Sequence, residues 1–145
     1  GNSSRFIRNL VQKKQLFSQI DAYIAGSIEP GTFHINGRPS PGVSLEEAEA
    51  AIWKELEAMK TEAILEEELE KVKNRYESEQ IFGNINYLNV ATNLAFFELI
   101  GKAEDINDEV KKYRAVTSQD IQRVASETFV KENCSVLYYK SQVSS

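Results

Sequence analysis

The sequence predicts an α+β fold, in which a small antiparallel sheet carries helices packed on one face. Residues 17–28 and 32–38 alternate apolar with polar side chains, which is typical of strands, and Pro30-Gly31 between them indicates a turn. After residue 44, apolar residues recur at the three- to four-residue spacing of amphipathic helices. Residues 134–139 then predict a short closing strand. The predicted order of one helix, two strands, three or four helices and one strand favours this layered fold.

The composition predicts a single globular domain over residues 1–145. The 22 acidic and 17 basic residues give a net charge of -5, and the basic residues are spread out, which excludes a typical nucleic-acid-binding surface. No apolar run approaches the ~20 residues of a membrane span. Because Cys134 is the only cysteine, no internal disulfide can form. The compartment, bacterial periplasm or cytoplasm, is therefore left open.

The first elements are a short helix and a hairpin. Ser3 or Ser4 can cap the helix, which we expect to end within residues 13–15. One face of the hairpin is apolar, and its inward residues are Ile20, Ala22, Ile24, Ile28, Phe33 and Ile35. His34 and Asn36 alternate with them and should face outward. Three strands leave two open edges, so we expect missing strands, or another chain or domain, to cover an edge.

The helices that follow have clear start and stop signals. Ser44 and Glu47 form a capping box before the first of them. The second opens near Leu65 and bends or breaks near Gly83-Asn84, a third ends at Gly101, and the last opens at residues 117–120. Their expected apolar faces comprise Ala48, Ile52, Leu56 and Met59; Leu69, Val72 and Tyr76; Leu88, Ala91, Ala95 and Leu99; and Ile121, Val124, Ala125 and Phe129.

The residues that carry chemistry are too few for a catalytic site. His34 is the only histidine, whereas a zinc peptidase site needs two or three nitrogen or oxygen ligands. We expect His34 to be a surface residue and Cys134 to be a packed thiol. The acidic run at residues 66–70 begins a helix, where carboxylates interact favourably with the helix dipole, and we interpret it as a solvated face. The sequence predicts no catalytic residue and no metal ligand.

Five segments resemble, in order, the C-terminal, inactive half-domain of the pitrilysin, insulinase and mitochondrial-processing-peptidase family of zinc metallopeptidases. Together they cover nearly the whole chain. They are residues 2–6 (Asn-Ser-Ser-Arg-Phe), 65–73 (Leu-Glu-Glu-Glu-Leu-Glu-Lys-Val-Lys), 93–101 (Asn-Leu-Ala-Phe-Phe-Glu-Leu-Ile-Gly), 113–121 (Tyr-Arg-Ala-Val-Thr-Ser-Gln-Asp-Ile) and 135–139 (Ser-Val-Leu-Tyr-Tyr). The resemblance implies that half-domains enclose a chamber, and that one half carries zinc on a His-x-x-Glu-His motif. This chain lacks that motif and resembles the other half, truncated before its leading strands.

The resemblance also implies an Arg and a Tyr that bind substrate or assist catalysis in the inactive half. In the register set by Ser4-Arg5-Phe6 and Leu16, Val11 and Ser18 occupy these two positions. Valine donates no hydrogen bond, and serine is too short to reach where a phenol would lie. We therefore expect the Arg/Tyr role to be absent from this chain.

Two functions remain open at this point. The first is a non-catalytic, structural and substrate-enclosing domain of a zinc metallopeptidase that cleaves peptides. Its zinc would lie in a catalytic half-domain or subunit of the same family, and this chain alone would be inactive. The alternative is a scaffold or assembly subunit without peptidase activity, which the residues at positions 11 and 18 favour. Self-association through the exposed sheet edge is a further expectation.

Overall fold

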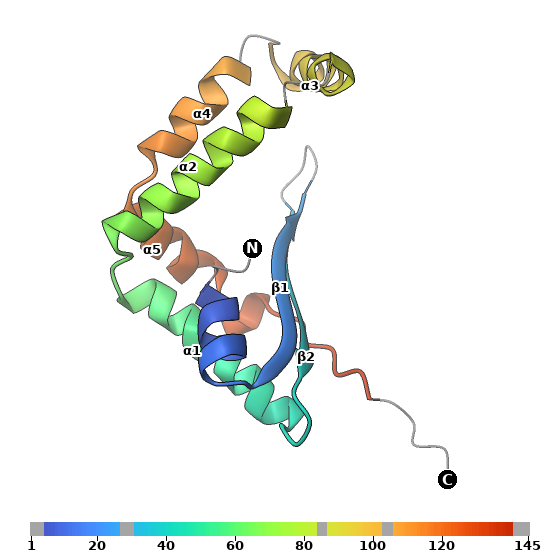
Figure 1. The fold of residues 1–145 in the computed structure, drawn as a ribbon, viewed down its shortest axis with the longest axis vertical. Helices are drawn as coiled ribbons and strands as arrows, with labels where there is room; N and C mark the ends of the chain where they lie inside the picture. Colours follow the sequence, from blue (N-terminus) through green and yellow to red (C-terminus); the bar gives the residue numbers. More distant parts are fainter. Residues whose placement is uncertain (1–4, 27–30, 84–86, 103–105, 141–145) are drawn as a thin grey trace. The chain divides into compact units, whose positions relative to one another are not determined.

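The computed structural model describes residues 5–26, 31–83, 87–102 and 106–140. Figure 1 shows the course of the chain. The chain divides into two compact units. We call residues 1–61 with 125–145 the hairpin unit, and residues 62–124 the helical unit.

The hairpin unit begins with a π-helical segment, η1 (Ile7–Lys13), where the sequence predicts a helix. Gln15 takes a left-handed backbone conformation with a φ of 53°, which turns the chain from η1 into the first strand. The strands β1 (Phe17–Ala25) and β2 (Thr32–Pro39) pair in an antiparallel sheet, as predicted. The end of the first predicted strand, with Ile28 and Pro30, lies outside the described residues.

The strand register confirms which side chains share the inner face. Ile24 lies opposite Phe33, Ala22 opposite Ile35, and Ile20 opposite Gly37. Burial is nevertheless confined to one end of this face, because Ile20 is 3% exposed whereas Ile24 is 74% exposed. Alternation therefore predicts the face correctly but not how much of it is covered.

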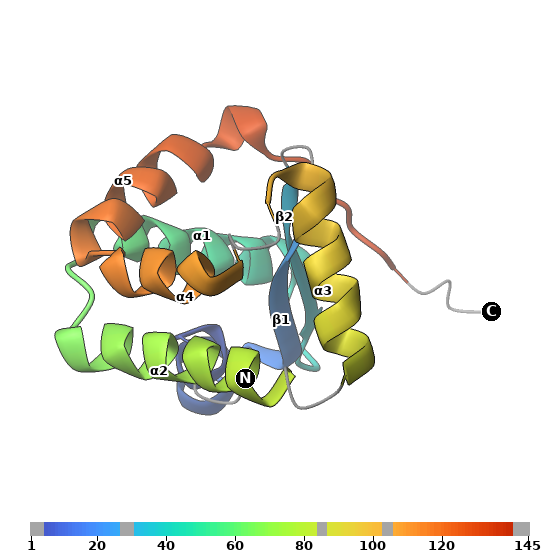
Figure 2. The same ribbon diagram turned by 90° about the horizontal axis from the view of Figure 1, so that it is seen from above.

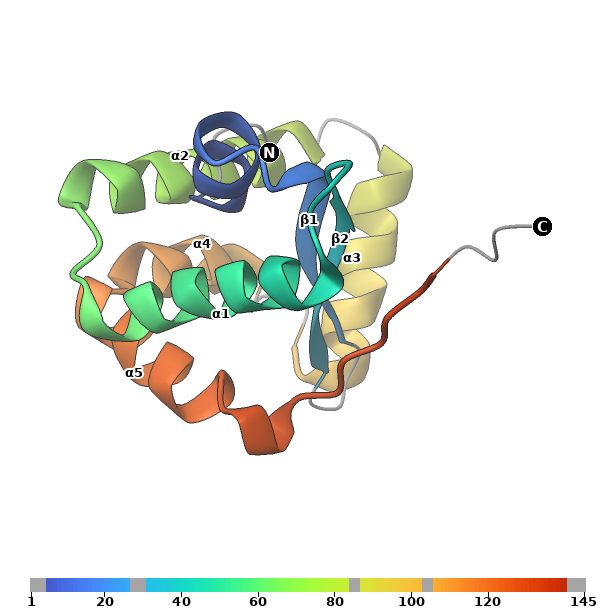
Figure 3. The ribbon, with the colours of Figure 1, turned by 90° about the horizontal axis from the view of Figure 1, so that it is seen from below.

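The core of the hairpin unit forms where η1 and helix α1 (Leu45–Thr61) meet this end of the sheet (Figure 3). Its buried residues are Leu10, Phe17, Ile20 and Ala48. The Ser44 hydroxyl accepts a hydrogen bond from the Glu47 amide at 3.0 Å, so the predicted cap opens α1. The ring of Phe17 packs on Gly37, where an added Cβ would lie 2.6 Å from a ring carbon.

The closing strand predicted at residues 134–139 is wrong. The described sheet contains only β1 and β2, and a single 3₁₀ turn, η3 (Lys131–Asn133), leads into residues 134–140 without strand pairing. Cys134 does have the extended backbone of a strand, with φ -113° and ψ 136°. A strand also needs a neighbour for its N–H and C=O groups, and this segment has no ladder partner among the described residues.

In the helical unit, α2 (Glu66–Gly83) and α4 (Ile106–Ala115) lie side by side (Figures 1 and 2). The predicted break near Gly83-Asn84 matches the end of α2, and Asn84 lies outside the described residues. The sequence reading did not single out α4, although acids in its first turn and basic residues in its last turn are helix signals.

The last helix, α5 (Ser118–Thr128), begins in the helical unit and ends in the hairpin unit. Thr117 caps it reciprocally: its hydroxyl accepts from the Asp120 amide at 3.1 Å, and Asp120 accepts from the Thr117 amide at 2.9 Å. The predicted helix start at residues 117–120 is therefore confirmed.

Helix α3 (Tyr87–Ile100) ends before Gly101, as predicted. Its expected apolar face is not buried, since Leu88 is 72% exposed and Leu99 is 75% exposed. Among the helices that the structure describes, none is both long and apolar enough to cross a bilayer.

Candidate functional site

The single histidine lies on the polar face of the hairpin. Its strand register places His34 opposite Tyr23, and the two rings stack with their centroids 5.1 Å apart. The Nε2 atom lies 2.7 Å from the Thr32 hydroxyl, so a surface neighbour already occupies this ring nitrogen. The structure thus places His34 on the outward face that strand alternation predicts.

The described residues do not fit a zinc ion. No group of three or more His, Cys, Asp or Glu side chains in the described ranges could hold a metal. A zinc site requires three or four such ligands in tetrahedral geometry. We therefore derive no metal-assisted step from the described part of this chain.

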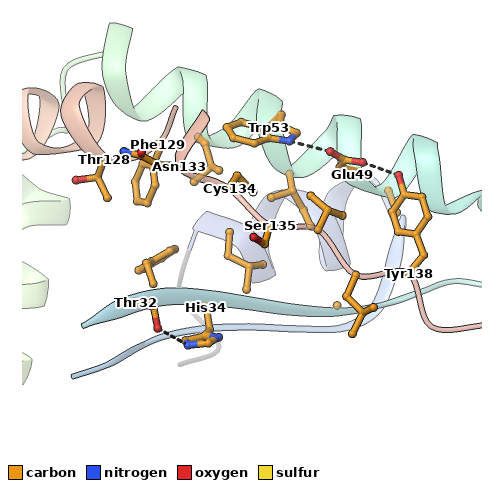
Figure 4. A pocket seen from close by; sticks show the side chains of 18 of the residues that line it. Thr32, His34, Glu49, Trp53, Thr128, Phe129, Asn133, Cys134, Ser135 and Tyr138 are labelled. Carbon is orange, nitrogen blue, oxygen red and sulfur yellow. Dashed lines mark hydrogen bonds between the residues drawn. The ribbon is translucent and has the colours of Figure 1, made fainter. Parts of the chain in front are cut away.

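The cysteine differs from its prediction. Cys134 is free and exposed, not a packed thiol. The prediction assumed that residues 134–139 join the sheet and pack against the helices, whereas this segment lies outside the described sheet. Figure 4 shows His34 beside Thr32 at the sheet and Cys134 on the chain segment across from it.

The acidic run begins α2, as predicted, with residues 66–68 in its first turn. Glu70 forms an ion pair with Lys73 of the same helix, at 3.4 Å. The sequence reading missed Arg114 of α4, whose guanidinium contacts Glu70 at 3.0 Å and also bonds the Glu77 carboxylate. The hydrogen bond to Glu77 is the main cause that raises the pKa of Arg114. Glu70 and Glu77 thus link α2 to α4 through Arg114, instead of forming a catalytic or metal site.

At the two positions that the resemblance assigns to an auxiliary Arg and Tyr, the side chains contact other parts of the hairpin unit. Val11 is partly buried and packs against the hydrophobic core. The Ser18 hydroxyl is exposed and donates to the backbone carbonyl of Arg38 at 3.1 Å. Val11 therefore contributes to packing, and Ser18 bonds the neighbouring strand.

A candidate binding feature is a groove in the hairpin unit, with a volume of about 580 Å³. Its lining residues come mainly from β2, α1 and residues 128–138. Much of the lining is apolar and includes Phe17, Phe33, Ile35, Leu45, Ala48, Ile52, Trp53, Leu56, Phe129, Val130, Val136 and Leu137. Its polar or reactive residues are Thr32, His34, Glu49, Thr128, Asn133, Cys134, Ser135 and Tyr138.

Hydrogen bonds to Glu49 of α1 hold residue 138 at the groove. Glu49 accepts hydrogen bonds from Trp53 Nε1 at 3.0 Å and from the Tyr138 hydroxyl at 2.5 Å (Figure 4). These two bonds, with the charge of Lys131, lower the pKa of Glu49, and the same Tyr138 bond raises the phenol pKa to about 12. The spacing of Glu49 and Trp53 on a helix could have indicated their contact. No local pattern could have indicated Tyr138, 89 residues away.

The chain resembles solved protease structures. A protease from Helicobacter pylori matches 88% of this chain with 26% identity and a TM-score of 0.76, and this chain covers 31% of that protein. A proposed zinc protease from Bordetella pertussis Tohama I matches 92% of this chain with 21% identity and a TM-score of 0.77, and 73% of that protein is covered. The inactive peptidase domain of a proposed zinc protease from Bordetella parapertussis matches 97% with 21% identity and a TM-score of 0.79, and 77% of that domain is covered.

These likenesses show the α+β fold, and the chain spans about a third of the length of the Helicobacter protease. No protein with a curated description matches the chain. The model of one family, described as the peptidase M16 inactive domain, matches residues 1–76. This match confirms the resemblance found in the sequence: the chain belongs to the peptidase M16 inactive-domain family.

Proposed function

We propose that the chain is a structural and substrate-enclosing half-domain of a zinc metallopeptidase that cleaves peptides. The catalytic half-domain or subunit would hold the zinc, and this chain would supply part of the chamber wall. The observation that carries the proposal is the match of residues 1–76 to a peptidase domain described as inactive. The likeness to about a third of the Helicobacter protease supports a place within a longer proteolytic assembly.

The surroundings of the two substituted positions support a wall without an auxiliary catalytic pair. Val11 packs inward against the core, where it adds stability instead of a hydrogen-bond donor. The Ser18 hydroxyl already bonds the backbone of Arg38. Interactions with a reacting carbonyl would then come from the partner half.

The test combines metal analysis with reconstitution. We expect the purified chain to contain no stoichiometric zinc and to leave a fluorogenic peptide library uncleaved, alone and with added zinc. Mixed with the catalytic half or subunit, it should raise peptide cleavage above the level of that partner alone. The matched variant is His34→Ala, which removes the only histidine and should change neither result. Tight zinc in the isolated chain, lost in this variant, would overturn the proposal.

A scaffold subunit is the second candidate, because both auxiliary positions carry residues without the required chemistry. The sequence of the rest of the parent protein and of its partner subunit separates the two. A His-x-x-Glu-His motif in either favours the peptidase. Its absence from both, together with a stable complex that cleaves no peptide, favours the scaffold.

A further inference from the structure

We propose that Tyr76 and Tyr113 form an oxidative modification site, at which one-electron oxidants generated from peroxide join the two phenol rings into a dityrosine. The new bond would link a ring carbon on α2 to a ring carbon on α4 and staple the two helices together. Both residues belong to the helical unit, so the site is independent of any peptidase activity.

The two tyrosine rings lie face to face. Their centroids are 3.6 Å apart and their planes differ by 14°. Most aromatic pairs in proteins are offset or edge-to-face, with centroids about 4.5–7 Å apart. Because so short a centroid distance leaves little sideways offset, the carbons of one ring face those of the other at van der Waals distance. The pair is therefore already in the contact that a carbon–carbon bond requires.

A hydrogen bond between the hydroxyls determines which carbons meet. Burial is the main cause that raises the pKa of Tyr76 to about 12, and a side-chain hydrogen bond with Tyr113 acts in the same direction. A bond that raises a phenol pKa stabilises the protonated form, so Tyr76 donates and Tyr113 accepts. With the hydroxyls at the same end of the stack, the ortho carbons beside them also face each other. Phenoxyl radicals of tyrosine couple at these carbons, because the side chain blocks the para position.

Neighbouring polar contacts keep the two helices in this register. Arg114, the next residue on α4, donates to Asn74 Oδ1 at 2.7 Å and to the Glu77 carboxylate at 3.1 Å. These two acceptors flank Tyr76 on α2. A face-to-face stack is not the arrangement that two rings prefer by themselves, and this clamp holds them together. The site is thus arranged before any oxidant arrives.

Tyr113 is the entry point for the oxidant, because it is 47% exposed whereas Tyr76 is partly buried. Loss of one electron and one proton from Tyr113 gives a phenoxyl radical, which takes the hydrogen atom that Tyr76 donates. A second one-electron oxidation, with loss of its proton, makes Tyr113 a radical again.

The two radicals then combine. Their unpaired electrons form the bond between the ortho carbons, and the hydrogen atoms on these carbons move to the oxygens, which restores both phenols. In total the chain loses two electrons and two protons, and these reduce one molecule of hydrogen peroxide to two of water.

Treatment of the purified chain with a haem peroxidase and hydrogen peroxide tests the proposal. We expect a monomeric product that is lighter by two hydrogen atoms and has dityrosine fluorescence. Proteolysis and mass spectrometry should find the peptides that contain Tyr76 and Tyr113 joined to each other. This mapping uses the unaltered chain, so its result does not depend on the folding of a variant. Joining of other tyrosines, dityrosine in covalent dimers only, or no dityrosine at all would overturn the proposal.

A matched pair of variants separates stacking from mere exposure. Tyr113→Phe keeps a ring in the stack but removes the phenol, and we expect it to lose the monomeric dityrosine product; Tyr76→Phe should do the same. Tyr23→Phe is the control, because Tyr23 is also 47% exposed and stacks on a ring that is not a phenol, that of His34. We expect this control to give the product in unchanged yield. An equal loss in Tyr113→Phe and Tyr23→Phe would assign the reaction to exposed tyrosines in general and overturn the site.

Discussion

Glu55 offers the sharpest test of how this fold is stabilised. It is the one charged residue among the described buried positions, with 8% of its surface exposed, and it lies on α1 beneath η1. Its carboxylate accepts hydrogen bonds from Asn9 Nδ2 at 2.7 Å and from Lys14 Nζ at 2.9 Å. Glu55→Ala removes both bonds and leaves the partly buried Asn9 amide without this acceptor.

The size of the effect follows from these contacts. A hydrogen bond to a charged group contributes about 1.5–3 kcal/mol, whereas an exposed ion pair contributes about 0.2–1 kcal/mol. The Lys14 side chain is 40% exposed, so its share is at the lower end. We expect Glu55→Ala to lower the free energy of unfolding by about 2–3 kcal/mol. We expect Glu55→Gln, which keeps an oxygen acceptor but loses the charge, to lower it by about 1 kcal/mol.

Urea unfolding followed by circular dichroism measures these differences. The control is Glu57→Ala on the same helix, where an exposed carboxylate pairs with Lys60 and the loss should stay below about 0.5 kcal/mol. If Glu55→Ala is no more destabilising than this control, the buried carboxylate does not join η1 to α1 and the reasoning is wrong.

The pH dependence gives an independent check. Burial acts to raise the pKa of Glu55, but the hydrogen bonds from Asn9 and Lys14 outweigh it, so the pKa is lowered. The folded state then binds the proton less tightly than the unfolded state. The extra stability is present above the unfolded pKa of about 4.3 and is lost as the pH falls through the lowered value. The difference between the original chain and Glu55→Gln should therefore narrow under acid, and a constant difference down to pH ~3 would contradict this assignment.

Three further outcomes follow from the contacts. Gly37→Ala should lower the free energy of unfolding by about 1–3 kcal/mol in the same urea assay, because the added Cβ would overlap the buried ring of Phe17. Gly26→Ala should change the free energy of unfolding little, because the atom nearest to its added Cβ would lie 3.6 Å away. Arg114→Lys should speed hydrogen exchange in α2 and α4, since lysine cannot bridge two carboxylates with a planar fork, while Lys112→Ala at an exposed pair should leave exchange unchanged. In an alkaline spectrophotometric titration, Tyr138→Phe should remove one phenol that ionises near pH 12. A raised phenol pKa stabilises the folded state below the ordinary tyrosine pKa, and this stabilisation is lost as the pH rises through about 12. If the variant keeps the full absorbance change near pH 12, the hydrogen bond from Tyr138 to Glu49 is contradicted.

The elements that the sequence predicts well are those whose signals are local. The caps at Ser44 and Thr117 involve residues three positions apart, so a short sequence pattern is enough to indicate them. The hairpin of β1 and β2 also joins neighbouring segments, and its alternation correctly assigns Phe33 and Ile35 to one face. The order of weak motifs predicted the family that the match to residues 1–76 then confirmed.

The candidate groove could not be predicted in this way. Its sides come from β2, α1 and residues 128–138, which are far apart in the chain. The polar bond that fixes it joins Glu49 to Tyr138 across 89 positions. Such contacts depend on where the folded chain places each segment, and alternation or helical spacing carries no information about that.

The sequence by itself determined the type of most elements, the family, and the shortage of histidine for a zinc site. Only the tertiary structure decided which apolar faces are covered, and that residues 134–139 remain outside the sheet. The physical reason is that an apolar pattern records the capacity of a segment to be buried or paired. Whether that capacity is used depends on a partner segment at the right place, and a strand without such a neighbour stays extended but unpaired.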